Sequence, residues 1–309
     1  MRIVHIWDQA GVAYILAKYQ QLSGHQVKVM KVADYDKYGI NKFYQNYMLN
    51  VKPEEFLDRC TEESELADII HIHSRIDVLF RLREKFGGSK KIVLHYHGTD
   101  IRGLDKRKDR ATQRLSLSSM IHTSKRKIAT KILSFYLTRA RQNQVHAQKL
   151  ANAVIVSTPD LLQLVPKASY LPNPIDTDHF RPDPSPKNQR KEALTMDTEV
   201  TDIKWALNYC RKNNIGLDIE VYRRMVAPIM YADMPQFLKR YKVYVDIRHV
   251  DKSILQNLSK TALEALACGL DVLDYQLKYH KGLPSEHDPV NVVSRLSSIY
   301  LKAATPNSF

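Results

Sequence analysis

The stretch DIRHVDKSILQNLSKTALEALACGLDVLDY, residues 246–275, decides how the chain folds. Apolar residues alternate at 243–247, which predicts a strand that leads into it. A polar loop follows, and Ser259 then offers an N-cap for a helix with an apolar stripe. Gly269 stands where a helix C-terminus favours a residue free to take positive φ, and residues 270–275 predict the next strand. This order of elements indicates an α/β unit whose short helix packs closely against a sheet.

The start of this helix is a predicted anion site. Ser259, Lys260 and Thr261 offer backbone N–H groups without helical partners, the positive end of the helix dipole and one full positive charge. Phosphate is the anion that such a site favours. Glu264 is the one acid of the helix, and it either contacts a ligand or only pairs with Lys260 one turn earlier.

The segment SKTALEALACG, which begins at Ser259, resembles the second half of the signature of family 4 glycosyltransferases, which have the GT-B fold. In that family two glutamates separated by seven residues lead into this helix. The second glutamate holds the nucleotide ribose, and amides at the helix start hold the donor diphosphate. The resemblance implies that Glu264 binds ribose and that Ser259, Lys260 and Thr261 bind the diphosphate. The first glutamate of the family pattern, which recognises the donor sugar, corresponds to Gln256 in this chain. This position therefore carries an amide in place of a carboxylate.

Two more segments carry the resemblance. VSTPDLLQLVPKASYLPNPIDTDHFRPDP, residues 156–184, resembles the stretch that joins the two domains of family 4 enzymes. DQAGVAYILAKYQQLSGHQVKV, residues 8–29, resembles the family's first βα unit, in which a glycine-rich turn opens a helix near the donor phosphate. Gly11 is the glycine of that turn here, and the resemblance implies that it lies near the diphosphate.

The segment HYHGTDIRG, residues 95–103, follows a predicted strand. In the family a histidine after this strand faces the donor sugar, so the resemblance implies this role for His97. It also implies that Asp100 and Arg102 line the acceptor side.

The cations that would neutralise the departing diphosphate are less clearly marked. Family members usually carry an arginine and a lysine near the first βα turn of the second domain. In the matching residues 192–209 only Lys204 fits. Arg223 and Arg224 are substitutes in principle, or they belong to a solvated turn. The catalytic residues that the resemblance implies are His97, Lys204 and Glu264.

Four histidines allow a different prediction. His71 with His73, and His95 with His97, lie two residues apart on strands, so each pair shares one face of a sheet. Four imidazoles could bind zinc. Hydrogen-bonded core histidines are the other interpretation of His71 and His73, and no acidic ligand accompanies the four. Because the GT-B enzymes that the chain resembles usually need no metal, we expect neither a metal nor another cofactor.

The composition indicates a globular protein with an anionic partner. The 309 residues suffice for two domains, and a formal charge of +14 favours a nucleotide, a nucleic acid or an acidic membrane. Cys60, Cys210 and Cys268 form no paired motif, which favours a reducing compartment. The start is not that of a signal peptide, and no apolar run could span a bilayer. We therefore expect a cytoplasmic protein, either free or peripheral on the inner face of the membrane.

The segment Arg102–Leu150 holds most of the excess positive charge. Apolar residues recur every four positions from Ile128 to Ala140 among lysines and arginines, which predicts a basic amphipathic helix. Such a helix suits an anionic membrane surface, or it packs on the sheet and leaves its charges in solvent. Because aromatic residues are not interleaved with the charge, we expect no nucleic acid partner.

Strands alternate with helices over most of the chain, which predicts two Rossmann-like domains. The fold class is α/β of the GT-B type: an acceptor domain at 1–170, a cleft, a somewhat trimmed donor domain at 171–289, and a C-terminal helix and tail at 290–309. The resemblance implies a retaining glycosyltransferase that moves a sugar from a nucleotide-sugar donor to a sugar, glycan or lipid-linked acceptor. The alternatives are a sugar-nucleotide epimerase and a catalytically silent GT-B module that acts as a partner or membrane adaptor.

Overall fold

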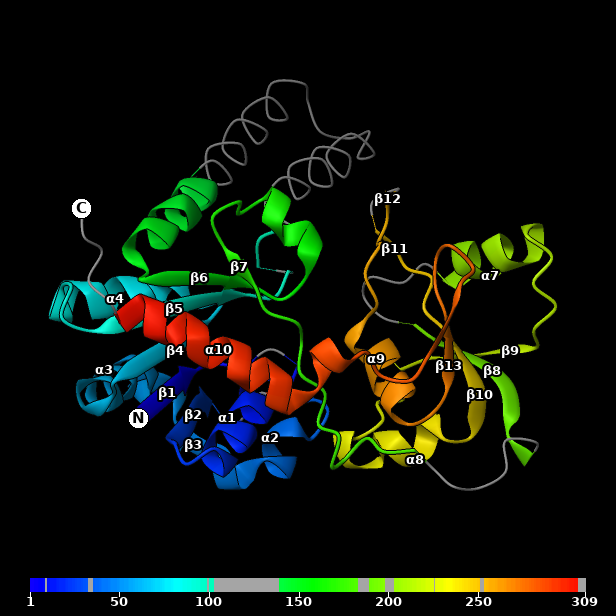
Figure 1. The fold of residues 1–309 in the computed structure, drawn as a ribbon, viewed down its shortest axis with the longest axis horizontal. Helices are drawn as coiled ribbons and strands as arrows, with labels where there is room; N and C mark the ends of the chain where they lie inside the picture. The colour runs from blue at the N-terminus through cyan, green and yellow to red at the C-terminus, as the bar shows by residue number, and fades with distance from the viewer. Residues whose placement is uncertain are drawn as a thin grey trace, which may run out of the picture.

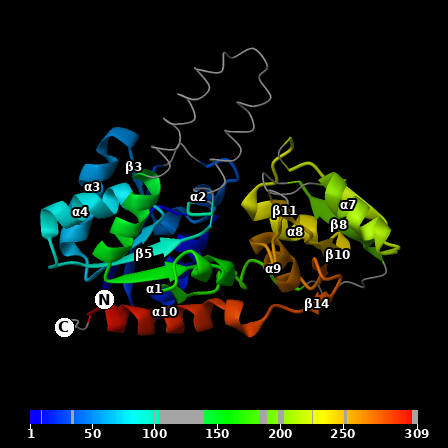
Figure 2. The same ribbon diagram turned by 90° about the horizontal axis from the view of Figure 1, so that it is seen from above.

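The computed structural model describes residues 1–8, 10–32, 36–98, 100–102, 139–182, 189–197, 203–224, 226–250 and 253–304. Two α/β lobes lie side by side, the first blue to green and the second mostly yellow to orange in Figure 1. Helix α10 (Pro289–Ala304) leaves the second lobe and runs back along the first, as Figure 2 also shows. The two domains are therefore tied together at the end of the described chain as well as by the segment between them.

The first domain is built on a seven-stranded parallel sheet with strand order β3-β2-β1-β4-β5-β6-β7. Strands β4 and β5 are buried along almost their whole length, because helices cover both faces of the sheet. The strands are β1 (Arg2–Ile6), β2 (Gln26–Val32), β3 (Met48–Val51), β4 (Ile69–His73), β5 (Lys91–Tyr96), β6 (Ala153–Val156) and β7 (Ser169–Tyr170).

Helices cover both faces of this sheet in the described part of the chain. Helices α1 (Val12–Leu22) and α10 pack on one face, and α3 (Phe56–Leu66) and α4 (Ile76–Phe86) pack on the other. Short elements connect them, namely α2 (Ile40–Phe43) and the 3-10 turns η1 (Gln45–Tyr47), η2 (Pro53–Glu55) and η3 (Pro159–Gln163). The carboxyl ends of the central strands, where open parallel sheets place their ligands, point toward the second domain (Figure 1).

The second domain has a smaller, five-stranded sheet with strand order β14-β13-β10-β8-β9. All its pairs are parallel except the edge pair of β13 and β14. Its strands are β8 (Lys191–Met196), β9 (Ile219–Tyr222), β10 (Tyr241–Val245), β13 (Asp271–Leu273) and β14 (Tyr279–Lys281), with a separate hairpin of β11 (His249–Val250) and β12 (Ser253–Ile254). Its helices and turns are α7 (Ile203–Lys212), η5 (Tyr231–Asp233), α8 (Met234–Leu238), α9 (Lys260–Ala267) and η6 (Ser285–His287).

The helix of the decisive stretch and the strand after it form where the sequence predicts them, whereas the strand before it ends at Val245 and the predicted polar loop contains the β11–β12 hairpin. Helix α9 begins after Ser259, whose side chain accepts a hydrogen bond from the N–H of Ala262 at 3.0 Å. Gly269 follows the helix with a φ of 83°, the left-handed conformation expected there. The helix is buried from Ala262 to Ala267 and lies between β10 and β13 in the chain, while Lys260 and Thr261 in its first turn remain half-buried.

The predicted basic helix lies largely outside the described residues. Of the segment Arg102–Leu150, the structure describes Arg102 and residues 139–150, and the latter are helical. Within the described ranges, no helix combines the length and the apolar character that crossing a membrane requires.

Candidate functional site

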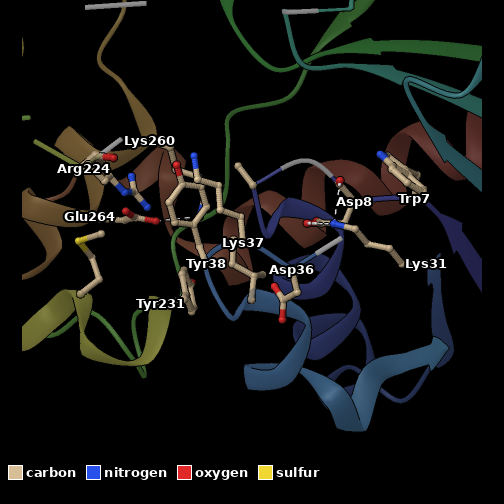
Figure 3. A pocket seen from close by; sticks show the side chains of 14 residues that line it. Trp7, Asp8, Lys31, Asp36, Lys37, Tyr38, Arg224, Tyr231, Lys260 and Glu264 are labelled. Atoms are coloured by element: carbon tan, nitrogen blue, oxygen red, sulfur yellow. Dashed lines mark hydrogen bonds and ion pairs between the residues drawn. The ribbon is translucent and has the colours of Figure 1, made fainter. Parts of the chain in front are cut away.

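A cavity of about 480 Å³ lies between the two domains, within the size range of small-molecule sites. Its walls come from the carboxyl ends of β1 and β2 on one side and from α9 and the loop after β9 on the other (Figure 3). The lining residues are Trp7, Asp8, Ala10, Lys31, Asp36, Lys37, Tyr38 and Ile40 from the first domain and Arg224, Tyr231, Met234, Lys260, Thr261 and Glu264 from the second.

The N-terminus of α9 opens into this cavity. The backbone N–H of Ser259 donates to Asp246 Oδ2 at 2.7 Å, and its hydroxyl caps the third residue of the helix. Among the described residues, no acceptor satisfies the N–H groups of Lys260 and Thr261, and both residues line the cavity. Two free amides at a positive helix end are a site for an anion.

Glu264 and Lys260 form an ion pair inside the cavity. Lys260 Nζ lies 2.8 Å from Glu264 Oε1, and the two side chains are 14% and 7% exposed. Glu264 therefore pairs one turn back along the helix and also faces the cavity, and its contact with a ligand stays a prediction (Figure 3). Lys260 Nζ also lies 5.5 Å from the centre of the Tyr231 ring. This pair leaves the second Glu264 oxygen available to accept hydrogen bonds from a ligand.

Arg224 supplies the second cation of this wall. Its guanidinium lies over the Tyr38 ring, 4.4 Å from the ring centre, so the two domains meet at this contact. Its Nε is buried and has no hydrogen-bond partner within the described part of the chain. An unsatisfied buried guanidinium N–H is costly. The same guanidinium belongs to a residue that lines the cavity, where it can meet an anion. The substitute that the sequence suggests thus reaches the cavity (Figure 3).

The two acids of the first domain are already occupied by backbone N–H groups. The Asp8 carboxylate accepts from the N–H groups of Gly11 and Ala13, each at 2.8 Å, and so caps α1. Asp36 accepts from the N–H groups of Asn41 and Lys42, each at 3.0 Å. Each carboxylate is stabilised at a helix N-terminus, and Lys31 lies 3.7 Å from Asp8 on the same wall, so cations from both domains line the cavity.

Gly11 lies beside the anion site but does not offer its own N–H to it, because that N–H donates to Asp8. Its φ is +83°, and a Cβ at this position would lie 3.7 Å from Lys260 Nζ of the facing domain. A glycine here therefore suits the left-handed turn, whereas the 3.7 Å spacing from Lys260 is an ordinary contact that a Cβ could also make.

Two other predicted residues lie outside the cavity. Gln256 is exposed in the loop before α9, and Lys204 is exposed on α7. Neither lines the cavity, whereas Arg224 does. The sequence could not choose between Lys204 and Arg224, because both follow strands of the second sheet and only the path of the loop after β9 brings one to the first domain.

The predicted acceptor-side residues stabilise the loop after β5. Asp100 accepts from the N–H groups of His97 at 3.0 Å and Gly98 at 2.7 Å. Arg102 makes a bidentate pair with Asp160, at 2.7 and 2.9 Å. A Cβ at Gly98 would collide with the Arg102 guanidinium, so the glycine is required for this turn. The predicted contact of Asp100 and Arg102 with an acceptor stays a prediction.

His97 lies in a closed ring of hydrogen bonds instead of lining the cavity. The bonds measure 2.7 to 3.3 Å and run from the first sheet to α1 and α10. Burial lowers the pKa of His97, while the carboxylates of Asp100 and Asp8 raise it. Both His97 ring nitrogens are engaged, so its predicted contact with a donor sugar has no counterpart in this arrangement. The members of the ring are His5, Gln20, His71, His73, His95, His97, Ser157 and Tyr300.

Two Rossmann-like domains that face each other across a cavity at the carboxyl ends of their strands define the GT-B fold, as the sequence predicts. The chain matches no protein-family model, and no curated protein sequence matches it either. Its likeness to known proteins is therefore a likeness of structure.

Several solved structures share this fold. An α-glucosyltransferase in complex with UDP and a 13-mer DNA containing a central A:G mismatch has a TM-score of 0.54 and 12% identity, over 98% of this chain and 91% of that one. An α-glucosyltransferase with UDP and DNA containing an HMU base gives a TM-score of 0.54 and 11% identity, over 97% and 90%. A UDP-N-acetylglucosamine 2-epimerase from Rickettsia bellii covers 98% of this chain and 96% of its own at 11% identity, with a looser TM-score of 0.45. The two likenesses with a TM-score of 0.54 support the GT-B fold.

Proposed function

We propose that the protein is a glycosyltransferase that moves a sugar from a nucleotide-sugar donor to an acceptor hydroxyl with retention of anomeric configuration. The observation that carries this proposal is the convergence of Arg224, Lys260 and the free amides of α9 on one wall of the cavity. This wall suits a diphosphate, and Glu264 suits a ribose. The two α-glucosyltransferase structures named above contain UDP, which supports a nucleotide ligand for this chain.

In this proposal the main task of the protein is to stabilise the diphosphate as it leaves. The bond between the sugar C1 and the β-phosphate oxygen breaks, and the acceptor hydroxyl oxygen bonds to C1 on the same face. The proton of that hydroxyl passes to the departing phosphate. Arg224 and Lys260 neutralise the charge that develops, and no side chain acts as a nucleophile. The acceptor, a sugar, a glycan or a lipid-linked sugar, binds on the side of the first domain.

Release of nucleoside diphosphate from a panel of nucleotide sugars, with and without simple sugar acceptors, tests the proposal. Turnover that requires an acceptor supports it. A donor converted to its epimer instead indicates a sugar-nucleotide epimerase. Binding of nucleoside diphosphate without any turnover indicates a silent GT-B module, which the exposed positions of Gln256 and Lys204 outside the cavity would then explain.

Glu264→Gln is expected to weaken binding of a nucleoside diphosphate by about 1–3 kcal/mol, because an amide replaces a charge-assisted acceptor of the ribose hydroxyls. Isothermal titration calorimetry measures the change. Glu286→Gln is the matched control, since Glu286 lies on η6 and outside the cavity. Equal affinities for the two variants would contradict the assignment of Glu264.

The basic segment gives a separate prediction about the membrane. Binding to vesicles is expected to rise with their content of anionic lipid and to fall with salt. Replacing Lys125, Arg126, Lys127 and Lys131 with Gln should cost roughly 4 kcal/mol, at about 1 kcal/mol per basic residue near the surface. Co-sedimentation with vesicles measures this loss, and equal binding to neutral vesicles would contradict the electrostatic account. A peripheral place on the inner face of the membrane, in the cytoplasm, is part of the same proposal.

A further inference from the structure

Five histidine side chains meet on one face of the first sheet. His5 lies on β1, His71 and His73 lie on β4, and His95 and His97 lie on β5 and directly after it. These strands are neighbours, with His5 beside His71 and His73 beside His95 in register. Alternation along each strand turns all five toward the face that α1 and α10 cover. The sequence alone indicates the four histidines of β4 and β5, counting the one directly after β5. The order of strands in the sheet places His5 beside them.

The ring nitrogens lie close enough together to share an ion. In His73, His95 and His97, one ring nitrogen of each residue lies within 4.8 Å of one ring nitrogen of each of the other two. The same is true of His5, His71 and His73. Zinc bonds to imidazole nitrogen are about 2.0–2.1 Å long, so tetrahedral ligand nitrogens stand roughly 3.4 Å apart. His73 Nδ1 and His97 Nε2 are 2.9 Å apart, and a shift of a fraction of an ångström would admit an ion between them.

The hydrogen bonds behind these residues orient a lone pair of His73 toward His97. Gln20 Oε1 can only accept, so His5 Nε2 donates to it at 2.8 Å. The bare His5 Nδ1 then accepts from His73 Nε2 at 3.0 Å, which leaves His73 Nδ1 without a proton. Metal-ligating histidines almost always donate their other N–H to such a partner. Gln20 thus prepares His73 as a ligand through His5.

Ser157 is a second partner of this kind. Its hydroxyl oxygen lies 2.8 Å from His97 Nδ1 and 2.9 Å from His95 Nε2, so it can accept from both rings. In the closed ring His97 Nε2 donates to the bare Nδ1 of His73. A metal ion would replace that proton, and His97 would then carry its proton on Nδ1 and donate it to Ser157.

The two sets of three histidines differ in their exposure to solvent. His5, His71 and His73 are all fully buried, whereas His97 is only half-buried and follows the carboxyl end of β5. We propose that His73, His95 and His97 form a three-histidine site for a divalent transition metal ion of the zinc class, with one coordination position left open. Neutral imidazoles select zinc, copper or nickel over magnesium, which prefers oxygen ligands. The site lies in the first domain, behind the cavity wall at Asp8, and it is independent of the proposed glycosyl transfer.

The test uses full-length protein stripped with a chelator and dialysed. Equilibrium dialysis and calorimetry with zinc chloride are expected to give one bound ion per chain, and magnesium chloride none. Cobalt in place of zinc should give the visible absorption bands of a four-coordinate ion. His97→Asn should remove stoichiometric binding, whereas the control His146→Asn, which removes an exposed histidine on the helix at 139–150, should retain it.

A second variant keeps all three ligands. Ser157→Ala should weaken zinc binding by about 10–100-fold, the usual effect of removing a group that orients a metal ligand. Circular dichroism confirms that each variant is folded. Zinc binding that is absent from the folded wild-type protein, or that survives unchanged in His97→Asn, would overturn the proposal, and the five histidines would then form only a neutral hydrogen-bonded ring. Neither result depends on whether the cavity binds a nucleotide sugar.

Discussion

Arg224→Ala is expected to weaken binding of a nucleoside diphosphate by about 2–5 kcal/mol, the range for removing one partner of a buried, hydrogen-bonded charge pair. Arg224 already lies over Tyr38 with a buried Nε that has no partner among the described residues, so an incoming phosphate finds it in place. Such preorganisation raises the contribution of Arg224 to the binding free energy, because its side chain loses little conformational entropy when the phosphate binds.

Three further variants sharpen this prediction. Arg224→Lys should recover only part of the affinity, since an ammonium cannot make two parallel hydrogen bonds to a phosphate. Lys204→Ala is the matched control for a lost positive charge in the same domain, and its exposed place on α7 predicts a change within about 0.5 kcal/mol. Tyr38→Leu should reduce the affinity by about 0.5–1 kcal/mol through loss of the cation–π contact. Calorimetry with UDP and with ADP measures all four variants.

The decisive measurement is the difference in nucleoside diphosphate affinity between Arg224→Ala and Lys204→Ala. If Lys204→Ala loses the affinity and Arg224→Ala does not, the family resemblance is the better guide and the domains close differently when the donor binds. If neither variant differs from wild type, the cavity is not the nucleotide site. A large loss for Arg224→Ala alone places the diphosphate where the free amides of α9 and Lys260 meet it.

Local signals in the sequence were enough to predict the fold. The N-cap at Ser259 and the left-handed residue at Gly269 fix both ends of α9 by bonds within a few residues. Strand periodicity and buried helices likewise depend on neighbouring residues, so β4 and β5 lie where they are predicted, and β10 begins and ends two residues before the predicted 243–247. The first turn of α9 reaches the cavity because ligand sites of open parallel sheets lie outside the carboxyl ends of the strands, and α9 begins on that side of the second sheet.

The rest of the site depends on contacts between distant parts of the chain. Tyr38 and Arg224 meet only because two loops on different domains cross the same gap, and no local pattern marks either one. The ring of histidines needs the order β1-β4-β5, which the sequence does not reveal. Asp100 is a different case: an acid two residues after Gly98 often accepts from nearby N–H groups in a turn, and that structural role could have been predicted.

The second large effect concerns Asp176, the residue that joins the two domains. It lies in the segment between them and is fully buried. Its Oδ1 lies 2.7 Å from Lys18 Nζ of α1, and its Oδ2 accepts from the Tyr44 hydroxyl at 2.7 Å. The Tyr44 oxygen is in turn 3.0 Å from that of Tyr231 on the second domain. One carboxylate therefore connects α1, the linker and the second domain.

Asp176→Ala is expected to lower the free energy of unfolding by about 3–5 kcal/mol, because it leaves Lys18, whose side chain is only 17% exposed, without its buried counter-ion. Asp176→Asn should cost less, since an amide oxygen can still accept from Tyr44. The control is Asp178→Asn: Asp178 also contacts Lys18, at 2.8 Å, but is 63% exposed, so its loss should stay within about 1 kcal/mol. Urea denaturation followed by tyrosine fluorescence measures all three. Equal losses for Asp176→Ala and Asp178→Asn would mean that burial adds nothing to this ion pair, and that the aromatic contacts of Tyr44 and Tyr231 hold the domains together without it.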